Sequence, residues 1–252
     1  MNWKIVMLFF VVPLLVHCGT GESRIKRKKN AVAHYKLGVA HLIGDVPSLQ
    51  KAYIEFQKTI QLDPKHRDAH YALGHIYFQQ ESYEEATQSF QKALSIDPDY
   101  SEAHNYLGRV YSLQGAYDQA VASYRKALSN LQYETPEKPY WNLGLIYVKQ
   151  QKYQDAVKEL KNALRVNPNL VSVHHLLGNV YSKMGDSEKS IAAYQRVLQI
   201  SPKDLNAHYN LACLYQKEGS VALAESTFQR VIELSPQLEN EADLRKCLNP
   251  VK

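Results

Sequence analysis

Residues 67–100 read RDAHYALGHIYFQQESYEEATQSFQKALSIDPDY, and this 34-residue stretch contains the pattern that decides the fold. Leu73 and Tyr77 are four positions apart, so they share one face of a helix. Gly74 lies between them and, having no side chain, allows a neighbouring element to approach closely. The first half of the stretch therefore predicts a helix that packs tightly against a partner.

A second helix follows in the same stretch. Ala86 and Phe90 are a small and a bulky residue four positions apart, so both face one side of a helix. Asp97-Pro98 ends this helix, because proline lacks an amide donor and its ring clashes with the preceding turn. One such helix pair cannot bury its apolar face alone, so pairs are expected to stack into a superhelix.

The same pattern occurs six times between Ala31 and Pro236. The small residue of each first helix follows a leucine (Leu37, Leu73, Leu107, Leu143, Leu177 and Leu211), and these small residues are Gly38, Gly74, Gly108, Gly144, Gly178 and Ala212. They are spaced 36, 34, 36, 34 and 34 positions apart. Five copies end at a proline, namely Pro64, Pro98, Pro168, Pro202 and Pro236. The chain is therefore predicted to be an array of one repeated unit.

This spacing resembles the tetratricopeptide repeat family over some four-fifths of the chain. The resemblance implies an all-α fold, a right-handed superhelical solenoid of six helix pairs followed by a C-terminal capping helix. The repeats are assigned to residues 31–64, 67–100, 101–134, 137–170, 171–204 and 205–236. The capping segment is assigned to 237–252, with its helix from Leu238 to Leu248.

Two copies depart from the strict period. The first carries two extra residues near positions 44–49. The third replaces its proline stop with a longer turn, Leu131-Gln132-Tyr133-Glu134-Thr135-Pro136-Glu137-Lys138.

The net charge of +5 is concentrated before the repeats. Six cations, Lys4 and five within residues 24–29, precede Ala31 and are opposed by Glu22. Subtracting these residues from the totals of 30 and 25 leaves 24 Lys plus Arg and 24 Asp plus Glu from Ala31 onward. A neutral array lacks the basic groove that binds phosphates, which argues against nucleic acid as a partner. We expect the basic run, within a neck of residues 18–30, to be solvated or to contact a membrane surface.

An apolar run extends from Ile5 to Val16 behind Lys4. It falls short of the about 20 apolar residues that a membrane-spanning helix needs, and it suits an export signal. We therefore predict that residues 1–17 are a signal peptide and that the protein leaves the cytoplasm.

The apolar run ends in Leu15-Val16-His17-Cys18-Gly19, which resembles a bacterial lipobox. The resemblance implies that Cys18 is lipidated and becomes the first residue of the mature chain. His17 departs from the pattern, which has a small residue there, so cleavage without lipidation and an uncleaved anchor stay as alternatives. Gly19 rather than aspartate after the cysteine implies sorting to the outer membrane. The expected location is the cell envelope, lipid-anchored on the periplasmic side of the outer membrane.

Cys213 and Cys247 lie 34 positions apart, which predicts equivalent sites on successive helices. Helix axes lie about 8–10 Å apart, whereas a disulfide needs Cα atoms within about 7 Å. Reduced, buried thiols are therefore expected, with a disulfide as the alternative.

The histidines do not predict a metal site. Five of the ten hold the same place in five repeats: His34, His70, His104, His174 and His208. Equivalent residues lie one helix spacing apart, farther than the roughly 4 Å between two ligands of one metal, so a packing role is expected. The sequence contains no HExxH, CxxC, GxSxG, GxxxxGK[ST] or GxGxxG motif. We therefore predict no catalytic residue, no cofactor and no small-molecule substrate.

In the tetratricopeptide repeat family, the second, fifth, ninth and twelfth residues of each first helix line a concave groove. The resemblance implies a groove for a protein or peptide partner, formed by Val32, Tyr35, Val39, Leu42, Tyr71, His75, Phe78, Trp141, Leu145 and Val148. The third and fifth repeats would add the polar residues Glu102, Asn105, Arg109, Ser112, His175, Asn179 and Ser182. For Tyr35 and Tyr71, packing between helices is the alternative role.

The lipobox, the six repeats and the extended third turn before Tyr140-Trp141-Asn142-Leu143-Gly144-Leu145 together resemble the pilotin lipoproteins of type IV pilus biogenesis. This resemblance implies a non-enzymatic adaptor that escorts a secretin subunit to the outer membrane. The alternative is a periplasmic scaffold for another envelope complex.

Overall fold

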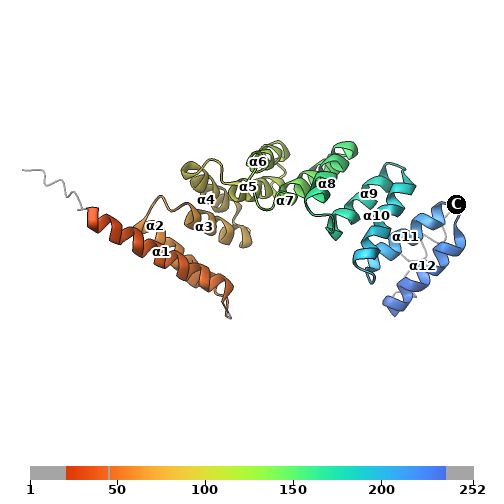
Figure 1. Ribbon diagram of the computed structural model, residues 1–252, viewed down its shortest axis with the longest axis horizontal. Coiled ribbons are helices and arrows are strands. Elements are labelled where there is room, and N and C mark those ends of the chain that lie inside the picture. The colour runs from red at the N-terminus through yellow and green to blue at the C-terminus, as the bar shows by residue number, and fades with distance from the viewer. Residues whose placement is uncertain (1–20, 45, 237–252) are drawn as a thin grey trace, which may run out of the picture.

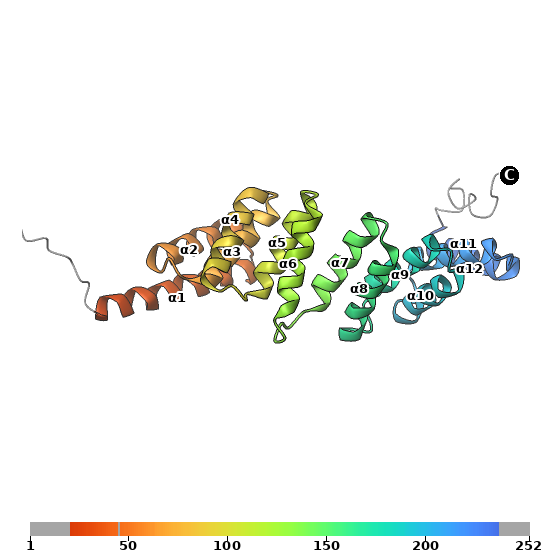
Figure 2. The ribbon, with the colours of Figure 1, turned by 90° about the horizontal axis from the view of Figure 1, so that it is seen from above.

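The computed structural model describes residues 21–44 and 46–236, and this part of the chain forms twelve α-helices. The helices are α1 (Gly21–Ile43), α2 (Leu49–Leu62), α3 (Arg67–Gln79), α4 (Tyr83–Ile96), α5 (Ser101–Leu113), α6 (Tyr117–Ser129), α7 (Glu137–Lys149), α8 (Tyr153–Val166), α9 (Val171–Lys183), α10 (Ser187–Ile200), α11 (Leu205–Lys217) and α12 (Val221–Leu234). They follow one another along the long axis of the molecule, with α1 at one end and α12 at the other (Figures 1 and 2).

The predicted all-α solenoid of six helix pairs is confirmed, and each odd-numbered helix packs against the even-numbered helix that follows it. The predicted signal peptide, Cys18 and the capping segment lie outside the described residues. Residues 21–30, which belong to the predicted basic neck, form the first turns of α1. Within the described ranges, no helix combines the length and the apolar character needed to cross a bilayer.

Each helix pair is closed by a small residue of the first helix against a large side chain of the second. A Cβ atom added at Gly74 would lie 2.7 Å from the Phe90 ring, and one added at Gly108 would lie 2.7 Å from the Tyr124 ring. These separations are well below the about 3.5–4.0 Å at which carbon atoms pack, so a larger residue would push the helices apart. The leucine-glycine pattern of the sequence therefore marks the contact between the two helices of a pair.

The turn inside most pairs places one residue in the left-handed region of backbone conformation. These residues are Glu81, Gly115, Gln151, Gly185 and Gly219, with φ between 58° and 77°. Gly115 adopts this conformation freely, whereas a residue with a Cβ does so at a cost of about 1 kcal/mol. The first pair has a longer loop between Ile43 and Leu49, where the sequence carries its two extra residues.

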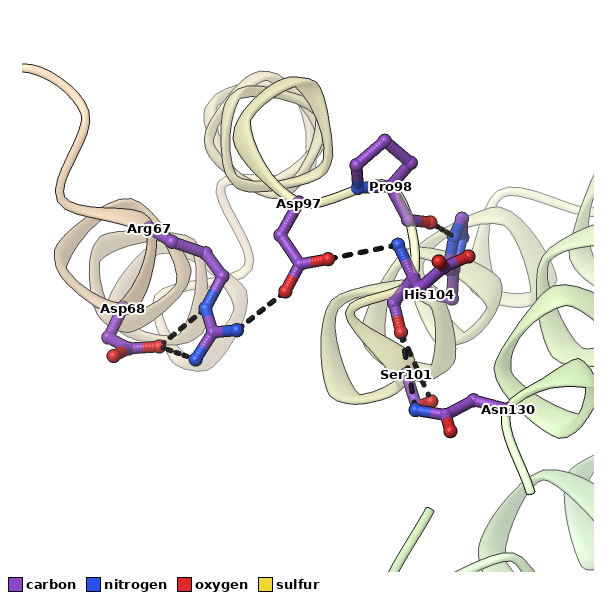
Figure 3. Close-up of polar contacts among 8 residues, drawn as sticks. Arg67, Asp68, Asp97, Pro98, Ser101, His104 and Asn130 are labelled. Atoms are coloured by element: carbon purple, nitrogen blue, oxygen red, sulfur yellow. Dashed lines mark hydrogen bonds and ion pairs between the residues drawn. The ribbon is translucent and has the colours of Figure 1, made fainter. Parts of the chain in front are cut away.

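Four of the five joints between successive pairs are turns that a histidine holds in place, and Figure 3 shows the one between α4 and α5. Between α4 and α5, Oδ1 of Asp97 accepts a hydrogen bond from the backbone amide of Asp99 at 3.1 Å. Nε2 of His104 donates to the carbonyl oxygen of Pro98 at 2.8 Å. The same bond joins three further pairs at 2.9–3.0 Å: His70 to Pro64, His174 to Pro168 and His208 to Pro202. Four of the five repeated histidines thus have the structural role that their periodicity predicted, whereas Nδ1 of His34 lies 2.6 Å from Oε2 of Glu55 in the first pair.

The joint between α6 and α7 has neither the histidine nor the proline stop, since Tyr140 stands at the histidine position. Other contacts connect the third and fourth pairs. Arg125 of α6 forms a two-pronged ion pair with the buried Glu159 of α8, with N–O distances of 2.7 and 3.3 Å. The amide of Asn142 donates to Oδ1 of Asn105 at 3.3 Å, which links α7 to α5. This joint is therefore held by side chains rather than by a histidine-bound turn.

Cys213 forms a disulfide, so the expected reduced thiol is wrong for this residue. It is also only half-buried on α11 rather than enclosed in the core. The expectation assumed a partner at the equivalent position of a stacked helix, about 8–10 Å away. A disulfide at Cys213 requires its partner to come closer than this arrangement allows. The two other cysteines, Cys18 and Cys247, lie outside the described residues.

We expect Gly108→Leu to lower the free energy of unfolding by about 1–3 kcal/mol, because the new side chain would overlap the Tyr124 ring. Urea denaturation measures the change. The matched control is Lys152→Gln at an exposed position before α8, which should stay within about 0.5 kcal/mol of the parent protein. A silent Gly108→Leu substitution would contradict the described contact.

A pH dependence is expected from His70, because burial lowers its pKa. The unfolded chain takes up a proton below a pKa of about 6.5, whereas the folded chain resists it. The contribution of neutral His70 to the free energy of unfolding is therefore fully present above about pH 6.5, and it declines as the pH falls below that value. Between about pH 7.5 and 5, the parent protein should lose more stability than His70→Gln, whose side chain does not titrate. Equal losses in urea denaturation of the two proteins would show that His70 does not cause the effect.

Candidate functional site

A cavity of about 360 Å³ lies where α3, α5 and α7 meet the extended turn between α6 and α7. We call it the central cavity, and its lining residues are Tyr71, Glu102, Asn105, Tyr106, Arg109, Tyr133, Thr135, Lys138, Trp141 and Asn142. The lining combines aromatic rings with amides and charged groups, a mixture typical of binding sites. Three successive first helices therefore contribute to one hollow.

One wall of the central cavity is a packed group of aromatic rings. The ring of Tyr71 lies 5.8 Å from that of Tyr106 and 5.1 Å from that of Tyr100, measured between ring centres. Nε2 of His75 and the hydroxyl of Tyr106 form a hydrogen bond of 3.0 Å. Tyr106 is thus held from two sides, so this wall is preformed rather than assembled on binding.

The same aromatic group positions a cation. The guanidinium carbon of Arg109 lies 4.5 Å from the centre of the Phe78 ring and 4.8 Å from the centre of the Tyr106 ring. Rings attract cations at such distances, so they hold the guanidinium at the cavity wall. Within the described residues Arg109 forms no ion pair, which leaves its charge available to a partner.

A second network supports the wall from the turn between α4 and α5 (Figure 3). Arg67 at the start of α3 forms ion pairs with Asp68 at 2.8 Å and with Asp97 at 2.5 Å. Its guanidinium carbon also lies 4.2 Å from the centre of the Tyr100 ring. Because the Tyr100 ring contacts Tyr71, this network ties the cavity wall to the joint between the second and third pairs.

The charge of the cavity at neutral pH follows from burial. Burial lowers the pKa of His75, and the nearby Arg109 lowers it further, so His75 is neutral. Burial also raises the pKa of Tyr133 to about 12, so its hydroxyl keeps its proton. The charged groups of the lining are then the cations Arg109 and Lys138 and the carboxylate Glu102. The cavity is weakly positive and rich in hydrogen-bonding groups, which suits a polar or acidic segment of a partner.

Trp141 separates the central cavity from a second hollow of about 390 Å³ along the same face. The second hollow is lined by Trp141, Leu145, Ser172, His175, Leu176, Asn179, Tyr194, Asn206 and Asn210. Nε1 of Trp141 is buried and has no hydrogen-bond partner among the described residues. Buried polar groups are usually hydrogen-bonded, so Nε1 of Trp141 is a donor that the described protein groups leave unused.

The residues expected to line the groove fall into different environments. In the first repeat, Val32 is exposed, whereas Tyr35, Val39 and Leu42 pack against the buried cluster around Phe56. Packing between helices, the alternative considered for Tyr35, is therefore what its contacts show. The described first repeat brings none of these four side chains to either hollow.

The second and fourth repeats contribute more of their predicted groove residues to the two hollows. Tyr71 lines the central cavity, while His75 contacts the lining residue Tyr106 and Phe78 contacts the lining residue Arg109. Trp141 lines both hollows and Leu145 the second, whereas Val148 lines neither. The predicted groove is thus shifted along the array toward its middle.

Several lining residues were not predicted from the sequence. Tyr133 and Thr135 come from the extended third turn, whose departure from the repeat period was the signal that could have identified them. Lys138 is the second residue of α7, so the family positions already pointed to it. Tyr106 and Asn142 lie one position beyond the family's groove positions, and no sequence signal marked them. Within the described residues, no three His, Cys, Asp or Glu side chains gather as metal ligands.

Family models cover much of the array. Models described as TPR repeat match residues 74–115, 144–185 and 183–219, and models described as tetratricopeptide repeat match residues 101–131 and 205–238. Together they span more than half of the chain, and the chain therefore belongs to the tetratricopeptide repeat family. No curated protein sequence matches the chain.

Solved structures share the fold. One is the structure described as a functional characterization of Pseudomonas aeruginosa pilF, which is 21% identical in sequence and has a TM-score of 0.74. The alignment covers 88% of this chain and 97% of the pilF chain. PilW, described as a widely conserved type IV pilus biogenesis factor, is 20% identical with a TM-score of 0.71, covering 87% and 98%. YrrB, described as a TPR protein with an unusual peptide-binding site, is 21% identical with a TM-score of 0.62, covering 77% and 95%. At these identities the likeness shows the fold alone.

Proposed function

We propose that this protein is a lipid-anchored adaptor of the bacterial cell envelope that binds a partner protein in its central cavity. Proteins of the tetratricopeptide repeat family are typically non-enzymatic scaffolds for protein interactions. The observation that carries the proposal is the preformed central cavity, which joins three successive first helices and the extended third turn.

The dimensions of the cavity suit a peptide segment. Neighbouring helices lie about 8–10 Å apart, and an extended peptide advances about 3.3 Å per residue. About five or six residues would therefore reach from α3 to α7. Tyr71, Tyr106 and Trp141 offer aromatic surface for apolar side chains, a residue type enriched among the dominant contacts of interfaces. Arg109 and Lys138 would favour an acidic group in the partner.

More narrowly, we propose a pilotin-like role in which the partner is a secretin subunit of a type IV pilus. The lipobox-like segment at Cys18 and the extended third turn support this role. The resemblance in fold to pilF and PilW over nearly their full lengths is consistent with it. The alternative is a scaffold for another envelope assembly, which the same cavity would serve.

The partner proposal is tested by reversing one charge at the cavity rim. Lys138 is exposed, so Lys138→Glu should leave the fold intact while opposing an acidic segment. We expect it to weaken binding of the secretin subunit about tenfold, which corresponds to about 1.4 kcal/mol. Binding is measured by titration with the purified subunit, and assembled secretin is measured in the outer-membrane fraction.

The matched control is Lys152→Glu, which makes the same charge reversal at an exposed position outside both hollows. It should bind like the parent protein. Equal weakening by both variants would indicate a general charge effect rather than a site. If deletion of the protein left secretin assembly unchanged, the narrower role would be wrong and the general scaffold would remain.

The membrane anchor is tested at Cys18. Acyl chains contribute about 0.8 kcal/mol of membrane affinity per buried CH₂ group. Cys18→Ser should therefore abolish labelling by a radioactive fatty acid and move the protein from the membrane pellet to the soluble or precursor pool. Unchanged fractionation of Cys18→Ser would instead favour an uncleaved apolar anchor.

A further inference from the structure

A cavity of about 500 Å³ lies at the start of the array, between the first turns of α1 and the turn that joins α2 to α3. Arg24, Arg27 and Lys28 of α1 line it together with Lys65 of the turn. Asp63 contributes a carboxylate to the lining. We call this hollow, far from the central cavity in sequence, the basic cavity.

The helical form of the basic run creates this arrangement. The helix α1 has 23 residues, whereas α3 has 13, and the basic run lies on the additional turns of α1. Residues 24, 27 and 28 are spaced by three and four positions and so share one helix face. Lys26 and Lys29 lie on the same turns but do not line the cavity. The helix thus divides the basic run into residues that line the cavity and an outer set, Lys26 and Lys29, that does not.

The opposite wall is held rigidly. The backbone amide of Lys65 donates to Oδ1 of Asp63 at 3.2 Å. The carbonyl oxygen of Pro64 accepts the hydrogen bond from Nε2 of His70 at 2.9 Å. The turn therefore keeps the backbone of Lys65 in a constant position relative to α3, while part of the Asp63 carboxylate is already engaged.

The Asp63 carboxylate offsets only one of the four positive charges that line the cavity. None of its four cations forms an ion pair within the described residues, although their side chains surround one hollow. Like charges repel over about 8–10 Å at ordinary ionic strength, so gathering them is unfavourable until an anion enters. The rest of the array has equal numbers of cations and anions, so this cavity is a local feature and not part of a basic groove.

We propose that the basic cavity binds the phosphate of an anionic lipid headgroup. This inference rests on the membrane attachment proposed above. Cys18 precedes Arg24 by six residues, and six residues of fully extended chain span at most about 20 Å. A lipid on Cys18 would therefore keep the cavity at the bilayer surface, where headgroup phosphates are concentrated. Together, the lipid and the headgroup make two contacts, and two contacts restrict how the long axis of the array is oriented on the membrane.

The test measures the chemical accessibility of two cavity lysines. The full-length protein, purified from membranes, is reconstituted into vesicles of phosphatidylcholine alone or with about a third phosphatidylglycerol. Acetylation rates at single lysines are then followed by mass spectrometry. We expect Lys28 and Lys65 to react about threefold more slowly on the anionic vesicles, and this protection to disappear at about 1 M salt. Lys152, which lies outside this cavity and far along the array, serves as the internal control and should react equally on both vesicles. Lys26, on the same turns of α1 but outside the cavity, should be protected less than Lys28.

Two matched double variants separate a site from a general charge effect. Arg24→Gln/Arg27→Gln removes two charges from the cavity, and Lys26→Gln/Lys29→Gln removes two charges from the outer set. The first variant should abolish the protection of Lys65, whereas the second should leave it unchanged. Equal effects of the two variants would overturn the proposal.

Two further outcomes would also overturn the headgroup site. One is equal reactivity of Lys28 and Lys65 on both vesicles. The other is full protection by inorganic phosphate on phosphatidylcholine vesicles, which would indicate a site for the free ion. Flotation with phosphatidylcholine vesicles tests the membrane anchor separately. If the protein floats with the vesicles but Lys28 and Lys65 are not protected by anionic lipid, the membrane anchor is supported and the headgroup site is refuted.

Discussion

The contact between a small residue on the first helix and a large side chain on the second is the constraint on which the whole array depends. At Gly108 a Cβ atom would already lie 2.7 Å from the Tyr124 ring, so a larger residue there would require this helix pair to shift. In the sixth pair the buried residues Ala212 and Phe228 occupy the same cluster, with alanine in place of glycine. Every further level of structure, including the stacking of pairs and the inner face, starts from helix pairs closed in this way.

The joints between pairs determine where the array is regular and where it can form a site. Four joints use the same bond from a histidine to a proline carbonyl, which leaves neighbouring pairs in a repeated arrangement. The joint between α6 and α7 lacks this bond and has a longer turn. Tyr133 and Thr135 of that turn reach the inner face and help to enclose the central cavity. The irregular joint therefore contributes aromatic and polar groups to the central cavity.

Charge is separated along the molecule in a way that suits the proposed role. The repeats are neutral in sum, so binding in the central cavity would depend on local groups such as Arg109 and Lys138 rather than on a long-range field. The excess positive charge lies on the first turns of α1, next to the residues that we propose to be attached to the membrane. The end that would contact lipid and the middle that would contact protein are thus chemically distinct.

The sequence by itself determined the helix pairs, their number and the structural role of the repeated histidines, because these depend on spacing within one 34-residue unit. It also indicated that Tyr71, Arg109 and Trp141 face the groove, since these positions follow from the repeat register. Only the tertiary structure decided that Tyr35 and Leu42 are occupied by packing against the Phe56 cluster. It also decided that Tyr71, Tyr133 and Lys138 surround one hollow, because they belong to separate segments whose distance depends on how the pairs stack. The disulfide at Cys213 was likewise decided by the tertiary structure, because the distance between two sulfur atoms depends on the path of the chain and not on spacing in sequence.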